Sequence, residues 1–203
     1  MVAARRPRNR RTLSSSVGDR LIVGLGNPGR EYENTRHNLG FRVVKRLASR
    51  WYVSLGRLEC NALVAESTEA LLAAPQTYMN RSGYAVRCLV EGRGFEPTDV
   101  LVVYDVVNLP LGRLLLRPSG GPGGHRGMES IVRSLQTEEI PRLRLGIATE
   151  ETEESSDDLV EFVLSSFVAG EEETVQELIE KAADACESWL QEGNEATMNR
   201  FNG

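Results

Sequence analysis

The sequence predicts an α/β fold, a single three-layer domain in which helices flank a central, mixed and twisted β-sheet. Short apolar runs, such as those at 21–25 and 99–104, have the length and composition of buried strands. Stretches with helical spacing of apolar residues, such as 39–48 and 128–135, alternate with them along the chain. The length of 203 residues suits one domain, which we assign to residues 20–203.

The other elements follow from apolar spacing and from the turn residues between the apolar runs. The predicted strands are 21–25, 61–66, 70–74, 99–104, 111–117 and 142–148, and the predicted helices are 39–48, 85–90, 128–135 and 171–191. Residues 118–127 form a glycine-rich loop, and the six acidic residues of 150–158 are predicted to lie in a solvated loop. We find no internal repeat.

The first 19 residues are predicted to form a disordered, basic arm. Five arginines lie within residues 5–11, serines follow them, and no apolar periodicity is present. An organelle transit segment has the same composition, and a misplaced start codon would also produce such a stretch. These three interpretations stay open.

Composition excludes several classes of protein. Hydrophobic residues make up 40% of the chain and charged residues 26%, and no apolar run approaches the length of a membrane span. The three cysteines, Cys60, Cys88 and Cys186, lie far apart without the spacing of a metal site, so neither a disulfide framework nor a zinc site is predicted. We therefore expect a protein of the reducing cytoplasm with no membrane partner. The sequence does not determine the oligomeric state, for which a monomer is the default.

Charge is unevenly distributed along the chain. Residues 1–148 carry 22 Lys and Arg against 13 Asp and Glu, whereas residues 149–203 carry 2 against 16. Such a chain can present a basic face to phosphates and keep its acidic part turned away, although a solvated surface of varying sign has the same composition. The net charge of −5 therefore does not exclude nucleic acid.

The segment GLGNPG at 24–29 matches the glycine pattern of dinucleotide-binding folds. In those folds a helix begins at the glycines, and an acidic residue about 20 residues later binds the ribose. Here a polar loop separates Gly29 from the helical spacing that begins at Leu39, and residues 44–46 offer no carboxylate. We therefore reject a nicotinamide or flavin site.

Polar side chains follow several predicted strands at the points where the strands end. His37 lies just ahead of a helix, where we expect it to be exposed, and Asp105 follows strand 99–104. Tyr78 and Asn80 lie at a strand-to-helix corner, a common position for functional side chains in open sheets. A carboxylate at the end of strand 99–104 would point into the crevice at the carboxyl ends of the strands.

Four motifs, in this order and at these intervals, resemble the bacterial-type peptidyl-tRNA hydrolase family across nearly all of 21–201. They are GLGNPGREYENTRHNLGF at 24–41, PQTYMNRSGYAV at 75–86, VVYDVVNLPLGRLLLRPSGGPGGHRGMESI at 102–131 and IPRLRLGIA at 140–148. The resemblance implies a hydrolase of translation that binds the tRNA acceptor end and the nascent peptide. It implies cleavage of the ester between the peptide and the 3′-terminal adenosine, which recycles the tRNA, without a metal or organic cofactor.

The resemblance also implies roles for individual residues. His37 would be the general base that activates water, and Asp105 would hold its imidazole in the working tautomer. Asn27 and Asn80 would contact the peptide backbone and the carbonyl, with Asn27 favouring blocked over free aminoacyl esters. Without the resemblance, Asn27 could be an ordinary turn former and Asn80 a helix cap. Tyr32 and Tyr78 would lie at the nucleotide end of the pocket, where a base or ribose can stack on them. Arg117 and Arg144 would bind tRNA phosphate.

Two positions depart from the family pattern. Arg126 stands where an asparagine is usual after the loop histidine, and Asn108 stands where an aspartate is common. Arginine cannot accept a hydrogen bond from water, so Arg126 could instead hold a phosphate or polarise the carbonyl. These departures keep open the alternative that the protein is a catalytically inactive relative, which binds RNA as a chaperone or splicing partner. A third hypothesis is an esterase of small esters that does not require tRNA.

Overall fold

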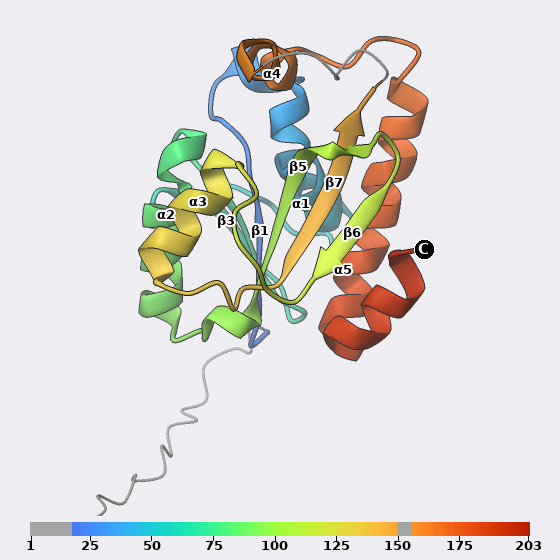
Figure 1. The fold of residues 1–203 in the computed structure, drawn as a ribbon. Helices are drawn as coiled ribbons and strands as arrows, with labels where there is room; N and C mark the ends of the chain where they lie inside the picture. The colour runs from blue at the N-terminus through green and yellow to red at the C-terminus, as the bar shows by residue number, and fades with distance from the viewer. Residues whose placement is uncertain (1–17, 150–155) are drawn as a thin grey trace, which may run out of the picture.

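The apolar runs form the strands of a seven-stranded sheet, the middle of three layers (Figure 1). The computed structural model describes residues 18–149 and 156–203. The strands are β1 Leu21–Gly24, β2 Arg57–Glu59, β3 Ala62–Glu66, β4 Leu71–Pro75, β5 Val100–Pro110, β6 Leu114–Arg117 and β7 Arg142–Ala148. Their order is β2-β3-β4-β1-β5-β7-β6, with β4, β1, β5 and β7 parallel and the others antiparallel. The predicted mixed sheet is confirmed.

Helices cover both faces of this sheet. Helices α2 and α3 pack on one face, and α1 and α5 pack on the other (Figure 1). The α-helices are α1 Leu39–Arg50, α2 Ser82–Arg93, α3 Arg126–Leu135, α4 Ser156–Leu164 and α5 Glu172–Phe201. Short 3₁₀ turns are η1 Arg30–Tyr32, η2 Arg36–Asn38, η3 Met79–Arg81 and η4 Pro97–Asp99. The predicted α/β class with flanking helices is therefore confirmed.

Two glycines bring α1 directly onto the sheet, beside the turn that carries His37. A Cβ atom on Gly40 would lie 2.3 Å from the carbonyl oxygen of Val103 and 2.5 Å from the backbone nitrogen of Leu25. A Cβ atom on Gly24 would lie 2.2 Å from the carbonyl oxygen of Gly40. Only residues without side chains allow this approach of backbones.

Replacing Gly40 by alanine is expected to lower the free energy of unfolding by about 1–3 kcal/mol, because the added methyl group overpacks a rigid contact. Gly92→Ala on α2 is the matched control, since a Cβ atom there meets nothing within 4 Å. That change should raise the free energy of unfolding by up to about 1 kcal/mol, because alanine favours helix. Urea unfolding followed by circular dichroism measures both, and equal shifts would contradict the close-contact explanation.

Several elements differ from their predictions. Strand β2 was not predicted because its three residues are largely exposed and show no apolar run. Helix α4 occupies part of the predicted acidic loop, and β5 continues past Asp105 instead of ending before it. Helix α5 extends to Phe201 through a kink at Gly193 (φ 79°, ψ −171°), where the apolar spacing is interrupted.

The acidic C-terminal part packs against basic side chains and is not turned away from them. Arg50 on α1 forms ion pairs with Glu180, Asp184 and Glu187 on α5. Two more arginines of α1 pair with the same helix, as Arg42 with Glu172 and Arg46 with Glu180. These arginines are therefore engaged within the fold.

Cys60 and Cys88 form a disulfide, so the expectation that these cysteines stay apart is wrong. Cys60 lies in the turn between β2 and β3, and Cys88 lies on α2. The hairpin folds back beside α2 and brings the two Cα atoms to 5.6 Å, although 28 residues separate them in sequence. Cys186 is a free, buried thiol.

Two other predictions concern the ends and the environment of the chain. The basic arm predicted for 1–19 falls outside the described residues except for its last two. Among the helices of 18–149 and 156–203, none is long and apolar enough to cross a membrane.

Candidate active site

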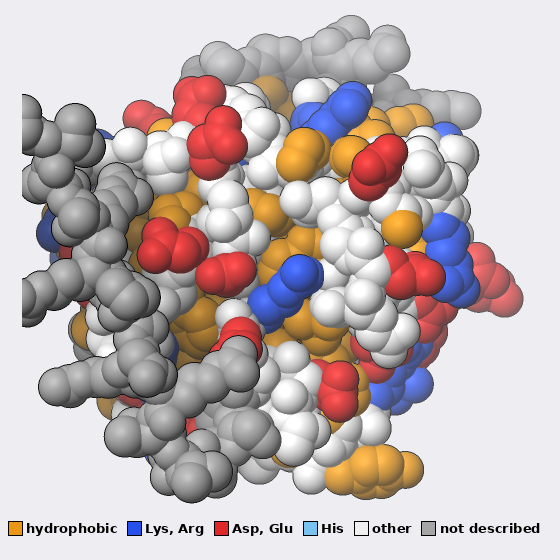
Figure 2. Space-filling view, turned by 90° about the horizontal axis from the view of Figure 1, so that it is seen from below, with side chains coloured by type: hydrophobic (Ala, Val, Ile, Leu, Met, Phe, Trp, Pro, Cys, Tyr) orange, Lys and Arg blue, Asp and Glu red, His pale blue; other side chains and the backbone are white. Residues whose placement is uncertain are grey.

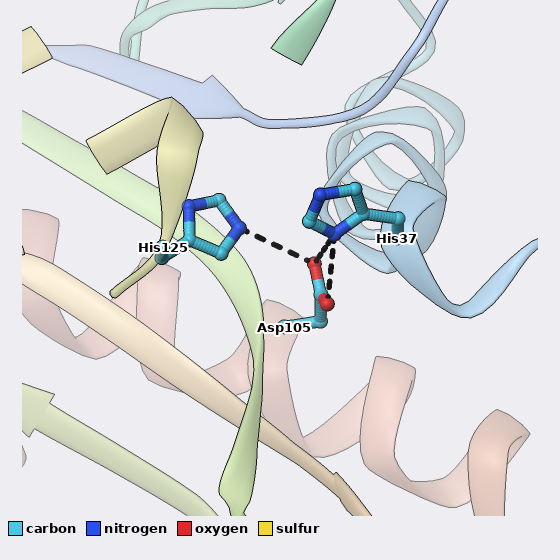
Figure 3. A group of neighbouring side chains, drawn as sticks. All are labelled: His37, Asp105 and His125. Carbon is cyan, nitrogen blue, oxygen red and sulfur yellow. Dashed lines mark hydrogen bonds and ion pairs between the residues drawn. The ribbon is translucent and has the colours of Figure 1, made fainter. Parts of the chain in front are cut away.

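Asp105 lies between two histidine rings toward the end of the sheet where the parallel strands finish (Figure 3). Nδ1 of His37 is 2.9 Å from both carboxylate oxygens, and Nε2 of His125 is 3.6 Å from Oδ1. Seen from the opposite end, the visible surface mixes acidic, basic and apolar side chains, and neither histidine shows among the described residues (Figure 2). Because β1 and β5 are parallel neighbours and β1 ends at Gly24, opposite Val103, the chain that leaves β1 passes beside Asp105, two residues further along β5, so His37 meets Asp105.

A pair of asparagines fixes the turn that leads from β1 to His37. The side chain of Asn38 accepts a hydrogen bond from the backbone N–H of Asn27 at 2.7 Å and donates to its carbonyl at 2.9 Å. The chain then passes through η1 and η2 before α1 begins. His37 was expected to be exposed, but its side chain is only 12% exposed because the ring is turned toward the buried carboxylate.

Burial and charge act in opposite directions on this pair. Burial of the ring favours neutral His37, but the charge and hydrogen bond of Asp105 outweigh it and raise the pKa of His37 above its usual value. The charge of Arg126 acts to lower it. Burial also favours protonated Asp105, yet the two histidines hold the pKa of Asp105 well below its usual range. The carboxylate is therefore ionised at neutral pH, although its side chain is only 1% exposed.

His125 was not predicted as a site residue. Its Nδ1 accepts a hydrogen bond from the backbone N–H of Met128 at 3.1 Å and so caps α3. That role requires an unprotonated Nδ1, so the ring proton is on Nε2 and faces Asp105. Burial lowers the pKa of His125, which keeps the ring neutral. The signal in the sequence was its place just before an amphipathic helix, which is the cap position.

Two cavities open on either side of His37. The first, of about 260 Å³, is lined by Asp105, Asn108, His125 and Arg126, with residues of α4. The second, of about 210 Å³, is lined by Asn27, Tyr78, Met79, Asn80 and Arg126, again with residues of α4. His37, Asp105 and His125 are also the one group among the described residues whose ligand atoms, within 4.8 Å of one another, could hold a metal ion.

Asn27 offers its donor and not its acceptor to the second cavity. Its Oδ1 accepts a hydrogen bond from the backbone N–H of Met79 at 2.8 Å. The side chain is nearly buried, and the amide nitrogen is the group left for a ligand.

Comparison with known proteins identifies the family. The model of the family described as peptidyl-tRNA hydrolase matches residues 21–203. The chain belongs to the peptidyl-tRNA hydrolase family. A relative of that name from Synechococcus sp. (strain JA-3-3Ab) is 46% identical, covering 92% of this chain and 84% of the relative. One from Bacillus cytotoxicus is 42% identical and covers 90% and 99%. The crystal structure of peptidyl-tRNA hydrolase from Acinetobacter baumannii superposes with a TM-score of 0.84 at 31% identity, covering 94% and 97%.

The structure brings most of the residues implied by the peptidyl-tRNA hydrolase resemblance to these cavities, but not all. Tyr32 is half-buried in η1 and does not line either cavity. Arg117 of β6 lies opposite Arg142 of β7 in the sheet. The β7 residue opposite Asp105 is Leu145, three residues further along, so Arg117 lies toward the end of the sheet away from the site. Arg144 lies nearer, because its Nη2 donates to Oδ1 of Asn108 at 2.7 Å at the edge of the first cavity.

Proposed function

We propose that this peptidyl-tRNA hydrolase cleaves the ester between a peptide, or a blocked aminoacyl group, and the 3′-terminal adenosine of tRNA by water that His37 activates. The observation that carries the proposal is the contact of His37 Nδ1 with both oxygens of buried, ionised Asp105, beside two cavities. Family membership supports the substrate class. The same membership gives no support to an inactive RNA-binding relative.

The hydrogen bond to Asp105 decides which nitrogen of His37 can act. Nδ1 carries the proton that it donates to the carboxylate, so Nε2 on the far side of the ring is the free acceptor. Nε2 takes a proton from water as the water oxygen attacks the ester carbonyl. The tetrahedral intermediate then breaks its bond to the ribose 3′-oxygen, which receives the proton from the imidazolium.

Direct attack by water fits the described residues better than an acyl-enzyme. Among the described cysteines, two are joined in a disulfide and Cys186 is buried in the core, where burial raises its pKa. Neither cavity is lined by a serine or a cysteine. A nucleophilic side chain would have to lie within hydrogen-bond reach of the base.

The amides and Arg126 surround the place where the ester would lie. The free Nδ2 of Asn27 can donate to a peptide carbonyl or to the developing oxyanion, and Asn80 is exposed at the same cavity. A donor in this place favours a blocked amino group, whose acyl carbonyl can accept the hydrogen bond, over a free ammonium, which can only donate. Tyr78 is 58% exposed beside them and can stack on the terminal base. Arg126 lines both cavities and can hold a phosphate or polarise the carbonyl.

The function is tested with three substrates: an N-acetyl-aminoacyl-tRNA, the corresponding free aminoacyl-tRNA, and the ethyl ester of the same N-acetyl amino acid. Release of the N-acetyl amino acid from the first should exceed hydrolysis of the other two. Equal cleavage of the ethyl ester and the tRNA ester would favour the small-ester esterase. Binding of tRNA without release would favour the RNA-binding relative.

The acid limb of the pH profile of kcat/KM should have its midpoint above 6.5, because the base acts when neutral and Asp105 raises the pKa of His37. Activity is therefore lost as the pH falls through that raised value. Arg126→Gln should move the midpoint to still higher pH, since the nearby positive charge that opposes protonation is removed. Arg133→Gln, on the same helix outside both cavities, is the control. A downward shift in Arg126→Gln would contradict this electrostatic role.

We further propose that the protein acts as a monomer and that Arg144 contacts tRNA phosphate. The cytoplasmic location expected from the cysteines loses its basis, because Cys60 and Cys88 form a disulfide. The position of Arg144 near the first cavity supports that contact, whereas Arg117 could reach only a more distant part of the tRNA. Light scattering of the purified protein, alone and with tRNA, tests the oligomeric state.

A further inference from the structure

Arg36, the residue before His37, is joined through its backbone to the segment that follows α4. Its N–H donates to the carbonyl of Ser165 at 2.9 Å. Next to it, Thr35 forms an isolated antiparallel bridge with Ser166. The turn that carries the base is therefore connected directly to the end of α4.

The side chain of Arg36 makes a second connection to the same region. Its guanidinium lies between the rings of Phe162 and Phe167, with Cζ 4.4 and 4.7 Å from the two centroids. Nη2 donates to both carboxylate oxygens of Glu171, at 2.8 and 3.1 Å. Glu171 also accepts from the backbone N–H of Val168 at 2.8 Å. One arginine thus contacts α4, the turn after it and the residue that precedes α5.

This ion pair is largely removed from water, since the side chains of Arg36 and Glu171 are 6% and 13% exposed. Burying two charges costs desolvation energy that offsets their attraction, so such a pair adds little net stability. Nη1 of Arg36 is buried without a hydrogen-bond partner among the described residues. The contacts are directional, and their main effect is to fix one placement of α4 relative to His37.

The placement of α4 matters because residues of this helix, which lies beyond the upper ends of the central strands in Figure 1, line both cavities. Leu159, Val160 and Val163 line the first cavity, beside Asp105. Val160, Val163 and Leu164 line the second, which contains Asn27. A shift of α4 would change the shape of both cavities at once.

We propose that Arg36 is a positioning residue: it holds α4 as the common wall of both cavities and thereby sets how tightly the substrate binds, without touching the substrate. The inference rests on the proposed function, because it requires that the substrate occupy these cavities. His37 and Asp105 keep their own contact when Arg36 is changed, so substrate binding is affected more than the chemical step.

Arg36→Met keeps an unbranched side chain between the two phenylalanines and removes the charge. It should raise KM for N-acetyl-aminoacyl-tRNA about tenfold while kcat changes less than about threefold. Glu171→Gln, which retains an acceptor, should raise KM in the same direction by a smaller factor. Arg50→Met is the matched control, because it breaks ion pairs between α1 and α5 away from α4, and it should leave KM unchanged.

Hydrogen exchange provides a readout that does not depend on activity. In Arg36→Met the amides of residues 159–168 should exchange about tenfold faster than in the unmodified protein, and in Arg50→Met they should not. An unchanged KM together with unchanged exchange in Arg36→Met would overturn the proposal, as would equal effects of Arg36→Met and Arg50→Met. Inactivity of the unmodified protein would contradict the proposed function instead, and exchange would still decide whether Arg36 holds α4.

Discussion

Asp105→Asn is expected to lower kcat about 10⁴-fold, the size of effect seen when an orienting carboxylate of a hydrolytic triad becomes an amide. KM should change little, because Asp105 lies beneath the histidines and is 1% exposed. Initial rates with N-acetyl-aminoacyl-tRNA at saturating and low concentrations measure the two constants.

The reason lies in the number of N–H groups that face this carboxylate. His37 Nδ1 donates its proton to Asp105, and the N–H of His125 Nε2 faces Oδ1 from 3.6 Å, so an acceptor without hydrogens suits both rings. An asparagine has one acceptor oxygen, and its NH₂ group would face a donor or force His37 into the tautomer with Nε2 protonated. A ring in that tautomer cannot take a proton from water at Nε2.

The loss of charge should also move the acid limb of the pH profile. Asp105 raises the pKa of His37, so its replacement should shift the midpoint to lower pH, opposite to the shift expected for Arg126→Gln. Asp184→Asn is the control, since it removes an exposed carboxylate on α5. Activity in Asp105→Asn within tenfold of the unmodified protein would mean that His37 does not depend on this carboxylate.

The sequence allowed the main part of the site to be predicted because the relevant residues follow buried strands. His37 and Asp105 are 68 residues apart, but each comes after an apolar run long enough to be a central strand. The carboxyl ends of parallel strands meet at one edge of a sheet, and this rule places both side chains there. Their pairing as base and orienting group was expected from the family resemblance.

Other features depend on contacts between residues far apart in the chain. His125 is placed by a backbone N–H of α3, and the carboxylate that it faces is far away in the chain. Arg117 and Arg144 both lie on strands, but only the register of β6 against β7 shows that they are at different distances from the site. Helix α4 packs against Arg36 through Phe162, and composition suggested a solvated loop over 150–158, which includes its first three residues.

His37→Ala is expected to lower kcat about 10⁴-fold, at the upper end of the range attributed to general base catalysis and no less than Asp105→Asn, because Asp105 acts through His37; KM should change little. Free imidazole should restore part of the lost rate, because removal of the ring enlarges a cavity of about 260 Å³ that already borders Asp105. His37→Gln, which fills more of that space and supplies no base, should be rescued less.

Rescue by imidazole separates catalysis from a structural role, since a misfolded site would not regain activity with a small base. Release by His37→Ala equal to that of the unmodified protein would remove His37 from the mechanism. His125 could not readily take its place, because its Nδ1 is occupied by the N–H of Met128 and its Nε2 is buried against Asp105. Neither of its nitrogens is free to accept a proton from water, so the described site contains one histidine that can act as the base.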